Sequence, residues 1–170
     1  EPPRRERFAG LEGGEGVDND IYVQAEPGSA NARALAEMKS VEPQFAVGPF
    51  LTGAKSAYEM ILMAFERGDL SGVRAFLAPP VAEAFESVIA ERQARNLTTT
   101  AEFLGTRETA LAEAEFNRAT GMAELSVRFV GEMIVATRDA DGNVVEGDPK
   151  AARKQRDVWT FARNMGAADP

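Results

Sequence analysis

The spacing of hydrophobic residues divides the chain into a helical first half and a strand-rich second half. Between residues 49 and 67, apolar side chains return every three or four positions, which places them on one face of a helix. The same spacing predicts a short helix over residues 70–77. A further helix is expected from the Pro79-Pro80 pair to about Asn96, because proline is well tolerated in the first helical turn.

After Asn96 the apolar positions alternate with polar ones, which indicates strands with one buried face. Asp141-Gly142 lies between two of these strands, and this dipeptide is a strong signal for a hairpin turn. Helices followed by antiparallel strands are the element order of an α+β domain. The strands are expected at residues 98–103, 111–116, 125–135, 144–145 and 158–161.

Residues 1–28 are rich in glycine, proline and acidic residues and contain few large apolar ones. Such a stretch buries too little surface to offset its ordering entropy, so it is predicted to be a disordered linker. Within it, Ile21-Tyr22-Val23 is an apolar spot. These three residues are either part of the tail or a segment that docks on a partner or on the folded domain.

A helix with Ser29 or Asn31 as its N-cap is expected next, and it ends before Pro43. With its flanking residues it forms an N-terminal helical arm over residues 29–44. Its single apolar stripe, which includes Leu35, needs a partner to cover it. Two partners remain open, the domain of the same chain or a surface beyond it.

Two segments far apart in the sequence resemble a known family. Residues 50–69 read FLTGAKSAYEMILMAFERGD and residues 157–163 read DVWTFAR, an amphipathic helix closed by Gly-Asp and a late strand. Together they resemble the Tim44-like domain, named for the C-terminal domain of the mitochondrial protein that tethers the import motor to the inner-membrane translocase. The resemblance extends over residues 45–170, and it implies a membrane-associated adaptor rather than an enzyme.

The resemblance also carries expectations for the fold. Members adopt a nuclear-transport-factor-two-like cone, in which N-terminal helices pack in a strongly curved antiparallel sheet. Gly105 and Gly131 are expected at the bends that such curvature requires. Family members normally have a further strand after an Asp-Pro-Asn-Trp motif, and Asp169-Pro170 matches its beginning, so the final strand is expected to be truncated here.

Composition excludes several classes of function. The net charge of −8 and the pI near 4.7 argue against a nucleic-acid partner, because phosphate binding needs a concentrated basic surface. The chain has no cysteine and no histidine. Thiolate metal sites, thiol nucleophiles and histidine-dependent triads are therefore excluded, and neither a metal nor a cofactor is expected.

The location is inferred from the resemblance. No stretch of about 18 apolar residues occurs, so no membrane span is predicted within the chain. Arg4, Arg5 and Arg7 lie near its beginning. Alphaproteobacterial relatives carry a short hydrophobic segment followed by basic residues at this place. The resemblance therefore implies a domain at the cytoplasmic face of a bacterial inner membrane, held by an N-terminal anchor absent from this chain.

Apolar positions expected to line the inside of the cone form the first candidate site. Without titratable partners, such a lining suits an apolar ligand such as an acyl chain. The alternative is that these side chains fill the core completely. The set consists of Tyr58, Ile61, Phe65, Phe85, Ile89, Phe103, Leu125, Val127, Phe129, Met133, Trp159 and Phe161.

Few polar groups are available for catalysis in such a cone. They are Tyr58, Asp157, Glu132 and Arg128. Residues 128 and 132 share the polar phase of their strand and are expected to face solvent or an interface, which leaves Tyr58 without a clear base. No catalytic residue is therefore assigned. The acidic turn around Gly142 lacks the spacing of a calcium loop, so no metal ligand is assigned either.

A dense basic cluster, Lys150, Arg153, Lys154 and Arg156, lies between the predicted hairpin and the final strand. It is either a solvated surface or a contact for anionic lipid or an acidic partner, since each basic residue near an anionic membrane contributes on the order of 1 kcal/mol. Its contribution would matter most for a domain that is already tethered to the membrane.

These features favour a non-enzymatic adaptor or scaffold that binds protein partners at a membrane. The protein partner is not identified by the sequence, while an anionic lipid or an acyl chain is a further candidate partner and nucleic acid is not. The alternative function is a small-molecule-binding or enzymatic member of the same cone fold. An N-terminal hydrophobic anchor in the full gene would favour the adaptor.

Overall fold

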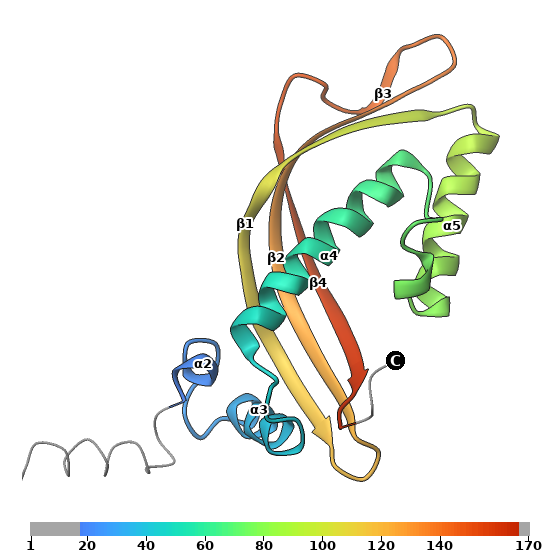
Figure 1. The fold of residues 1–170 in the computed structure, drawn as a ribbon. Helices are drawn as coiled ribbons and strands as arrows, with labels where there is room; N and C mark the ends of the chain where they lie inside the picture. The colour runs from blue at the N-terminus through green and yellow to red at the C-terminus, as the bar shows by residue number, and fades with distance from the viewer. Residues whose placement is uncertain (1–17, 167–170) are drawn as a thin grey trace, which may run out of the picture. The chain divides into compact units, whose positions relative to one another are not determined.

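The computed structural model describes residues 18–166, in which helices come first and four strands follow (Figure 1). The predicted α+β class is confirmed. The elements are α2 (Asn19–Tyr22), α3 (Ala30–Val41), α4 (Val47–Arg67), the 3-10 helix η1 (Arg74–Phe76), α5 (Pro79–Ala94), β1 (Thr98–Asn117), β2 (Met122–Arg138), β3 (Val144–Gly147) and β4 (Arg153–Asn164).

The four strands form one sheet in which β2 pairs with β1, β3 and β4. β2 and β3 are antiparallel, with Ala136 opposite Gly147. The predicted hairpin turn is confirmed between them, because the amide of Gly142 donates to the carbonyl of Asp139, and Gly142 has a φ of 85°. The Asp139 carboxylate accepts from the amides of Asp141 and Asn143 and therefore serves the turn.

Two of the predicted strands are one. Residues 98–103 and 111–116 belong to β1, which runs without interruption for 20 residues. Gly105 lies within it at a φ of 149°, and the alternation of exposed and buried positions shifts after this residue. A glycine can adopt this φ without steric cost, so the strand continues through an irregularity that breaks the sequence pattern.

The chain divides into two compact units. Among the described residues, unit 1 consists of residues 18–52, 110–128 and 158–166, and unit 2 consists of residues 53–109 and 129–157. α4, β1, β2 and β4 each contribute residues to both units.

In unit 1 the segment predicted as a linker is folded from residue 18 onward, so that prediction is wrong for residues 18–28; residues 1–17 lie outside the described residues. Ile21 is only 3% exposed. The carboxylate of Asp20 accepts from the first amides of α4, those of Val47 and Gly48, at 2.6 and 2.8 Å. The composition of residues 1–28 could not predict this cap, because 27 residues separate the carboxylate from the first amide that it caps.

The N-terminal helix α3 packs within unit 1. Ser29 is its N-cap, as one of the two predicted candidates, and Leu35 is fully buried. Asn31 binds the outer edge of β1, where its side chain donates to the carbonyl of Ala112 at 3.3 Å and accepts from the amide of Ala114 at 3.1 Å. The apolar stripe of this helix is thus covered within its own unit.

The centre of unit 2 is a group of aromatic rings between α4 and the sheet. Tyr58 of α4 stacks on Phe129 of β2 with ring centroids 4.2 Å apart, and its edge meets Phe103 of β1. Gly131 is extended rather than left-handed, and a Cβ at this position would lie 3.3 Å from the Phe103 ring. This glycine is needed because the two rings approach the sheet closely.

The helical region after α4 differs from the expectation. The predicted helix over residues 70–77 is reduced to the three-residue η1, and the large apolar side chain of Phe76 is 71% exposed. The valines of α5, Val81 and Val88, are exposed as well. Ala82 and Ile89 form the buried side of α5 instead, so the helix is rotated relative to the face that its larger residues suggested.

Candidate functional site

The residues predicted to line an apolar cavity are distributed through both units, and many of them pack against one another in the core. In unit 2, Tyr58, Phe103 and Phe129 pack against one another, and the Phe65 and Phe85 rings lie 4.9 Å apart. Most of the set is buried, namely Tyr58, Ile61, Ile89, Leu125, Val127, Phe129 and Met133. The half-buried members are Phe65, Phe85, Phe103, Trp159 and Phe161.

Tyr58 has a carboxylate partner that the sequence did not assign to it. Its hydroxyl donates to Oδ2 of Asp157 on β4 at 2.7 Å. Burial, followed by this hydrogen bond, raises the pKa of the Tyr58 phenol well above its usual range. The tyrosine ring has no exposed surface. The pair therefore holds a neutral phenol, whose ring is closed to solvent, against a half-buried carboxylate.

The other polar groups considered for catalysis do not join this pair. Glu132 accepts from Arg107 at 2.9 Å on the exposed side of the sheet, and this bond lowers the pKa of the Glu132 carboxyl. Arg128 is exposed, as predicted from its phase in the strand. Among residues 18–166, no group of three acidic side chains is arranged to hold a metal ion.

An apolar groove with a volume of about 510 Å³ lies in unit 1, and we call it the aromatic groove. It runs between the start of α4 and the end of β4. Phe50 meets Phe161 edge to face with ring centroids 5.7 Å apart, and Phe45 packs beside Phe50 at 6.2 Å. At the rim, Arg163 pairs with Glu42. The lining residues are Glu42, Gln44, Phe45, Ala46, Pro49, Phe50, Leu125, Phe161, Ala162, Arg163 and Met165.

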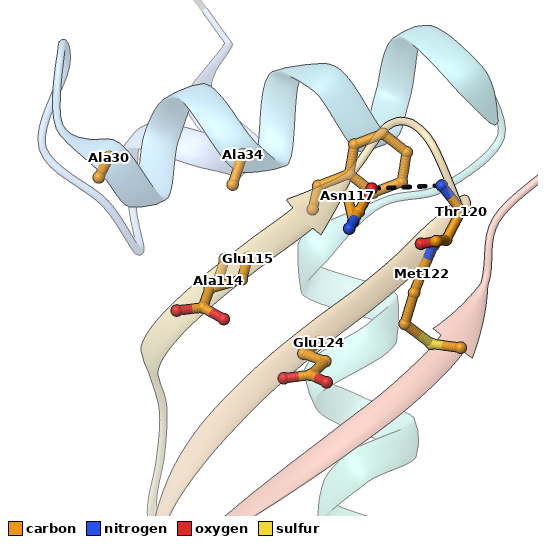
Figure 2. Close-up of a pocket in the computed structure, with 9 residues that line it drawn as sticks. Ala30, Ala34, Ala114, Glu115, Asn117, Thr120, Met122 and Glu124 are labelled. Atoms are coloured by element: carbon orange, nitrogen blue, oxygen red, sulfur yellow. Dashed lines mark hydrogen bonds between the residues drawn. The ribbon is translucent and has the colours of Figure 1, made fainter.

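A second hollow of about 760 Å³, which we call the helix–hairpin groove, lies in unit 1 between α3 and the β1–β2 hairpin. Figure 2 shows Ala30 and Ala34 pointing from the helix toward the strands, and the carboxylates of Glu115 and Glu124 projecting from neighbouring strands. Its remaining lining residues are Ala114, Phe116, Asn117, Thr120 and Met122. Asn117 shapes the hairpin, because its side-chain oxygen accepts from the amides of Ala119 and Thr120.

The basic cluster belongs to unit 2, and all four of its side chains are exposed. Arg153, Lys154 and Arg156 lie within the first residues of β4, rather than before the final strand as predicted, because β4 begins earlier than its apolar residues indicate. The charge of Lys154 acts on Glu132 and lowers the pKa of its carboxyl, so part of the cluster's field is cancelled locally.

Sequence reasoning found two residues of the aromatic groove, Leu125 and Phe161, and missed the rest. Phe45 and Phe50 flank the start of α4, where prolines interrupt the pattern, so neither belonged to the counted apolar face. The helix–hairpin groove gave no signal at all. Its walls are alanines and alternating glutamates, which in a sequence indicate an ordinary solvated surface.

Comparison with known families decides the classification. The Tim44-like domain matches residues 31–170. The chain belongs to the Tim44-like domain family. Members of this family are generally membrane-associated, protein-interacting domains without known enzymatic activity. The match includes the basic cluster and every lining residue of the two grooves except Ala30.

A solved structure with similarity to this Tim44-like chain is described as the intermembrane space region of the chloroplast protein ARC6. The two are 12% identical, the match covers 65% of this chain and 82% of that one, and the TM-score is 0.39. No curated protein matches significantly. Within residues 18–166, no helix has both the length and the apolar character needed to cross a membrane.

Proposed function

We propose that this chain is a non-enzymatic, membrane-associated adaptor domain whose aromatic groove receives an apolar segment of a protein partner. The observation that carries the proposal is the groove itself. Three half-buried phenylalanine rings, those of Phe45, Phe50 and Phe161, line an open hollow. Burying such rings would lower the free energy of an isolated domain, so a hollow that leaves them partly exposed indicates a surface for binding. Aromatic residues in a concave site are also the usual anchors of protein interfaces.

Family membership supports the non-enzymatic part of the proposal, because Tim44-like domains have no known enzymatic activity. Tyr58 and Asp157, two of the polar groups considered for catalysis, bind each other, and the ring of Tyr58 is fully buried. Family membership supports association with a membrane. We place the domain at the cytoplasmic face of a bacterial inner membrane, where an anchor outside this chain would tether it.

A photo-crosslinking experiment tests the groove. A photoreactive amino acid replaces Ala46, which lines the aromatic groove, and in a matched control it replaces Ala84, which is exposed on α5. The tethered protein is then irradiated in its native membranes. We expect a discrete protein adduct from position 46 and none from position 84. Equal labelling from both positions, or no protein adduct from position 46, would contradict the proposal.

An apolar small molecule is the second candidate occupant. A volume of about 510 Å³ lies within the range of roughly 300–1,000 Å³ that is typical of ligand pockets. An acyl chain could extend along the phenylalanine rings while its head group lies near the pair of Arg163 and Glu42. A lipid adduct without a protein adduct at position 46 would favour this function.

The basic cluster is proposed to orient the tethered domain on anionic lipid. Four exposed basic residues could contribute up to about 4 kcal/mol at low salt, which corresponds to only millimolar affinity. We therefore expect weak flotation of the free domain with anionic vesicles. For the tethered domain, reversing the charges of Lys150, Arg153, Lys154 and Arg156 should change its orientation. Tight, salt-resistant flotation of the free domain would contradict an orienting role and indicate apolar insertion.

A further inference from the structure

The lining of the helix–hairpin groove holds two carboxylates, Glu115 and Glu124, and no basic residue. Glu115 and Glu124 project from neighbouring strands, and both are exposed (Figure 2). Within residues 18–166, neither carboxylate has an ion pair or a side-chain hydrogen bond. Like charges on adjacent strands repel one another, so this arrangement lowers the stability of the hairpin.

The basic residues of α3 and of the hairpin turn have partners outside the groove. Arg33 of α3 donates to the carbonyl of Gly28 at 2.6 Å. Arg118, in the hairpin turn, pairs with Glu37 of α3 at 3.9 Å and donates to the Ser40 hydroxyl at 3.2 Å. Lys39 of the same helix bridges Asp18 and Asp20 at 2.9 Å each. Glu37, Asp18 and Asp20 thus have basic partners, whereas no basic side chain of residues 18–166 pairs with the two carboxylates in the groove.

The shape of the groove also restricts which side chains an occupant can have. Ala30 and Ala34 are one helical turn apart and have small side chains, so the wall formed by α3 leaves room for an entering chain. Met122 is 39% exposed in the hairpin that forms the floor, and methionine adapts readily to unbranched apolar side chains. An occupant that combines positive charge with an aliphatic side chain therefore complements both features.

We propose that the helix–hairpin groove docks a basic segment of a protein partner, with arginine or lysine side chains against Glu115 and Glu124 and an aliphatic side chain against Met122. The proposal rests on the adaptor function only in taking the partner to be a protein, and it uses a surface separate from the aromatic groove. Anionic lipid and nucleic acid would be repelled by the two carboxylates.

A peptide-binding assay tests the proposal directly. The probe is a fluorescein-labelled synthetic peptide, Arg-Leu-Arg-Arg-Leu-Arg, and binding to the full chain is followed by fluorescence anisotropy at low and physiological salt. The double variant Glu115→Lys, Glu124→Lys should weaken binding by about tenfold or more, since each exposed charge pair is worth up to about 1 kcal/mol and reversal adds repulsion.

Matched controls separate the groove from general attraction to an acidic chain. The double variant Glu83→Lys, Glu102→Lys makes the same change in net charge at two exposed, unpaired acids of unit 2, outside the groove. It should leave peptide affinity within about threefold of the original, as expected for screened charges at a distance. Equal weakening by both double variants would overturn the proposal.

A second pair of variants tests the shape without changing charge. Ala30→Leu fills the groove from α3, whereas Ala36→Leu enlarges an exposed alanine of the same helix that does not line it. Peptide binding should be lost with the first and retained with the second, at unchanged melting temperature. Retained binding with Ala30→Leu would also overturn the proposal. None of these variants changes a residue of the aromatic groove. The crosslinking experiment at position 46 therefore tests the proposed function independently of this inference.

Discussion

The hydroxyl of Tyr58 and the carboxylate of Asp157 form a 2.7 Å hydrogen bond that joins the middle of α4 to β4. The ring of Tyr58 is fully buried and stacks on Phe129, so the hydroxyl position is fixed by packing. A buried phenol needs a hydrogen-bond partner, because an unsatisfied hydroxyl in an apolar interior is costly. The pair is therefore a structural tie between a helix and a strand.

Replacing Tyr58 with phenylalanine should destabilise the protein by about 1–2 kcal/mol, because the carboxylate of Asp157 loses a hydrogen-bond donor while the ring packing is kept. Chemical denaturation at neutral pH measures this difference. An unchanged free energy of unfolding would indicate that water replaces the phenol without loss.

The same pair predicts a dependence of stability on pH. The pKa of the Tyr58 phenol is higher in the folded state than in the unfolded chain, where it has its ordinary value near 10. Stability from this group is therefore fully present below about pH 10 and is lost as the pH rises further. Between about pH 9 and 11, the wild type should lose more stability than Tyr58→Phe. Parallel curves for the two proteins would contradict the raised pKa.

Gly131 is predicted to tolerate no side chain. A Cβ at this position would lie 3.3 Å from the Phe103 ring and 3.5 Å from the Tyr58 ring, so Gly131→Ala should destabilise by about 1–3 kcal/mol through overpacking. Gly53 is the matched control, because it lies in α4 with nothing within 4 Å of its Cβ position. Gly53→Ala should stabilise by roughly 0.5–1 kcal/mol through helix propensity. The two melting temperatures should move in opposite directions.

Periodicity was enough to predict the elements that bury one regular face. α4 and the β2–β3 hairpin follow directly from helical spacing and from Asp141-Gly142. In β1 the alternation of buried and exposed residues changes phase at Gly105. In α5 the helical spacing did not identify the buried side, which is formed by Ala82 rather than by the larger Val81. In each case a packing choice between similar residues decided the outcome, and no single-sequence pattern records that choice.

The candidate sites were less predictable for a related reason. Phe161 was expected to line a cavity because it is an apolar residue of a strand, and it does line the aromatic groove. Its neighbour Phe50 comes from more than 100 residues earlier in the chain, and only the tertiary fold brings the two rings together. The helix–hairpin groove depends on Ala30 and Ala34 being small, which in a sequence indicates only helix propensity.

Asp20 is predicted to hold the N-terminal segment to unit 1. It accepts from the amides of Val47 and Gly48 and pairs with Lys39, so Asp20→Ala should cost about 1–2 kcal/mol as a lost helix cap. Asp20→Asn keeps an acceptor and should cost less. Deleting residues 1–28 should destabilise more than either variant, because Ile21 is buried. Full stability of the deletion would restore the linker interpretation.

The contribution of Asp20 to the stability of the fold also depends on pH, because its carboxylate must be ionised. Partial burial acts to raise its pKa, but hydrogen bonds from Lys39 and from the amides of Gly48 and Val47 outweigh burial and lower it. Stability from this carboxylate is therefore present above its ordinary pKa near 3.9 and is lost as the pH falls through the lower folded value. The stability difference between wild type and Asp20→Asn should shrink below about pH 4.

Asn31 is predicted to protect the outer edge of the sheet in unit 1. Its side chain makes one donor and one acceptor bond to the backbone of β1, at Ala112 and Ala114, and the carbonyl of the Gln24 side chain accepts from the amide of Leu111. These bonds satisfy backbone groups that a neighbouring strand would otherwise use, which is a way to block pairing with another chain.

The variant Asn31→Ala should therefore accelerate hydrogen exchange at the amide of Ala114 by roughly tenfold, because a lost hydrogen bond of about 1–1.5 kcal/mol controls local opening. The amide of Leu111 serves as the internal control, since its acceptor is Gln24 rather than Asn31. It should change little in this variant and should respond instead to Gln24→Ala. Equal acceleration at both amides in either variant would mean that the whole segment detaches as one unit, so that the two side chains cover the edge only together.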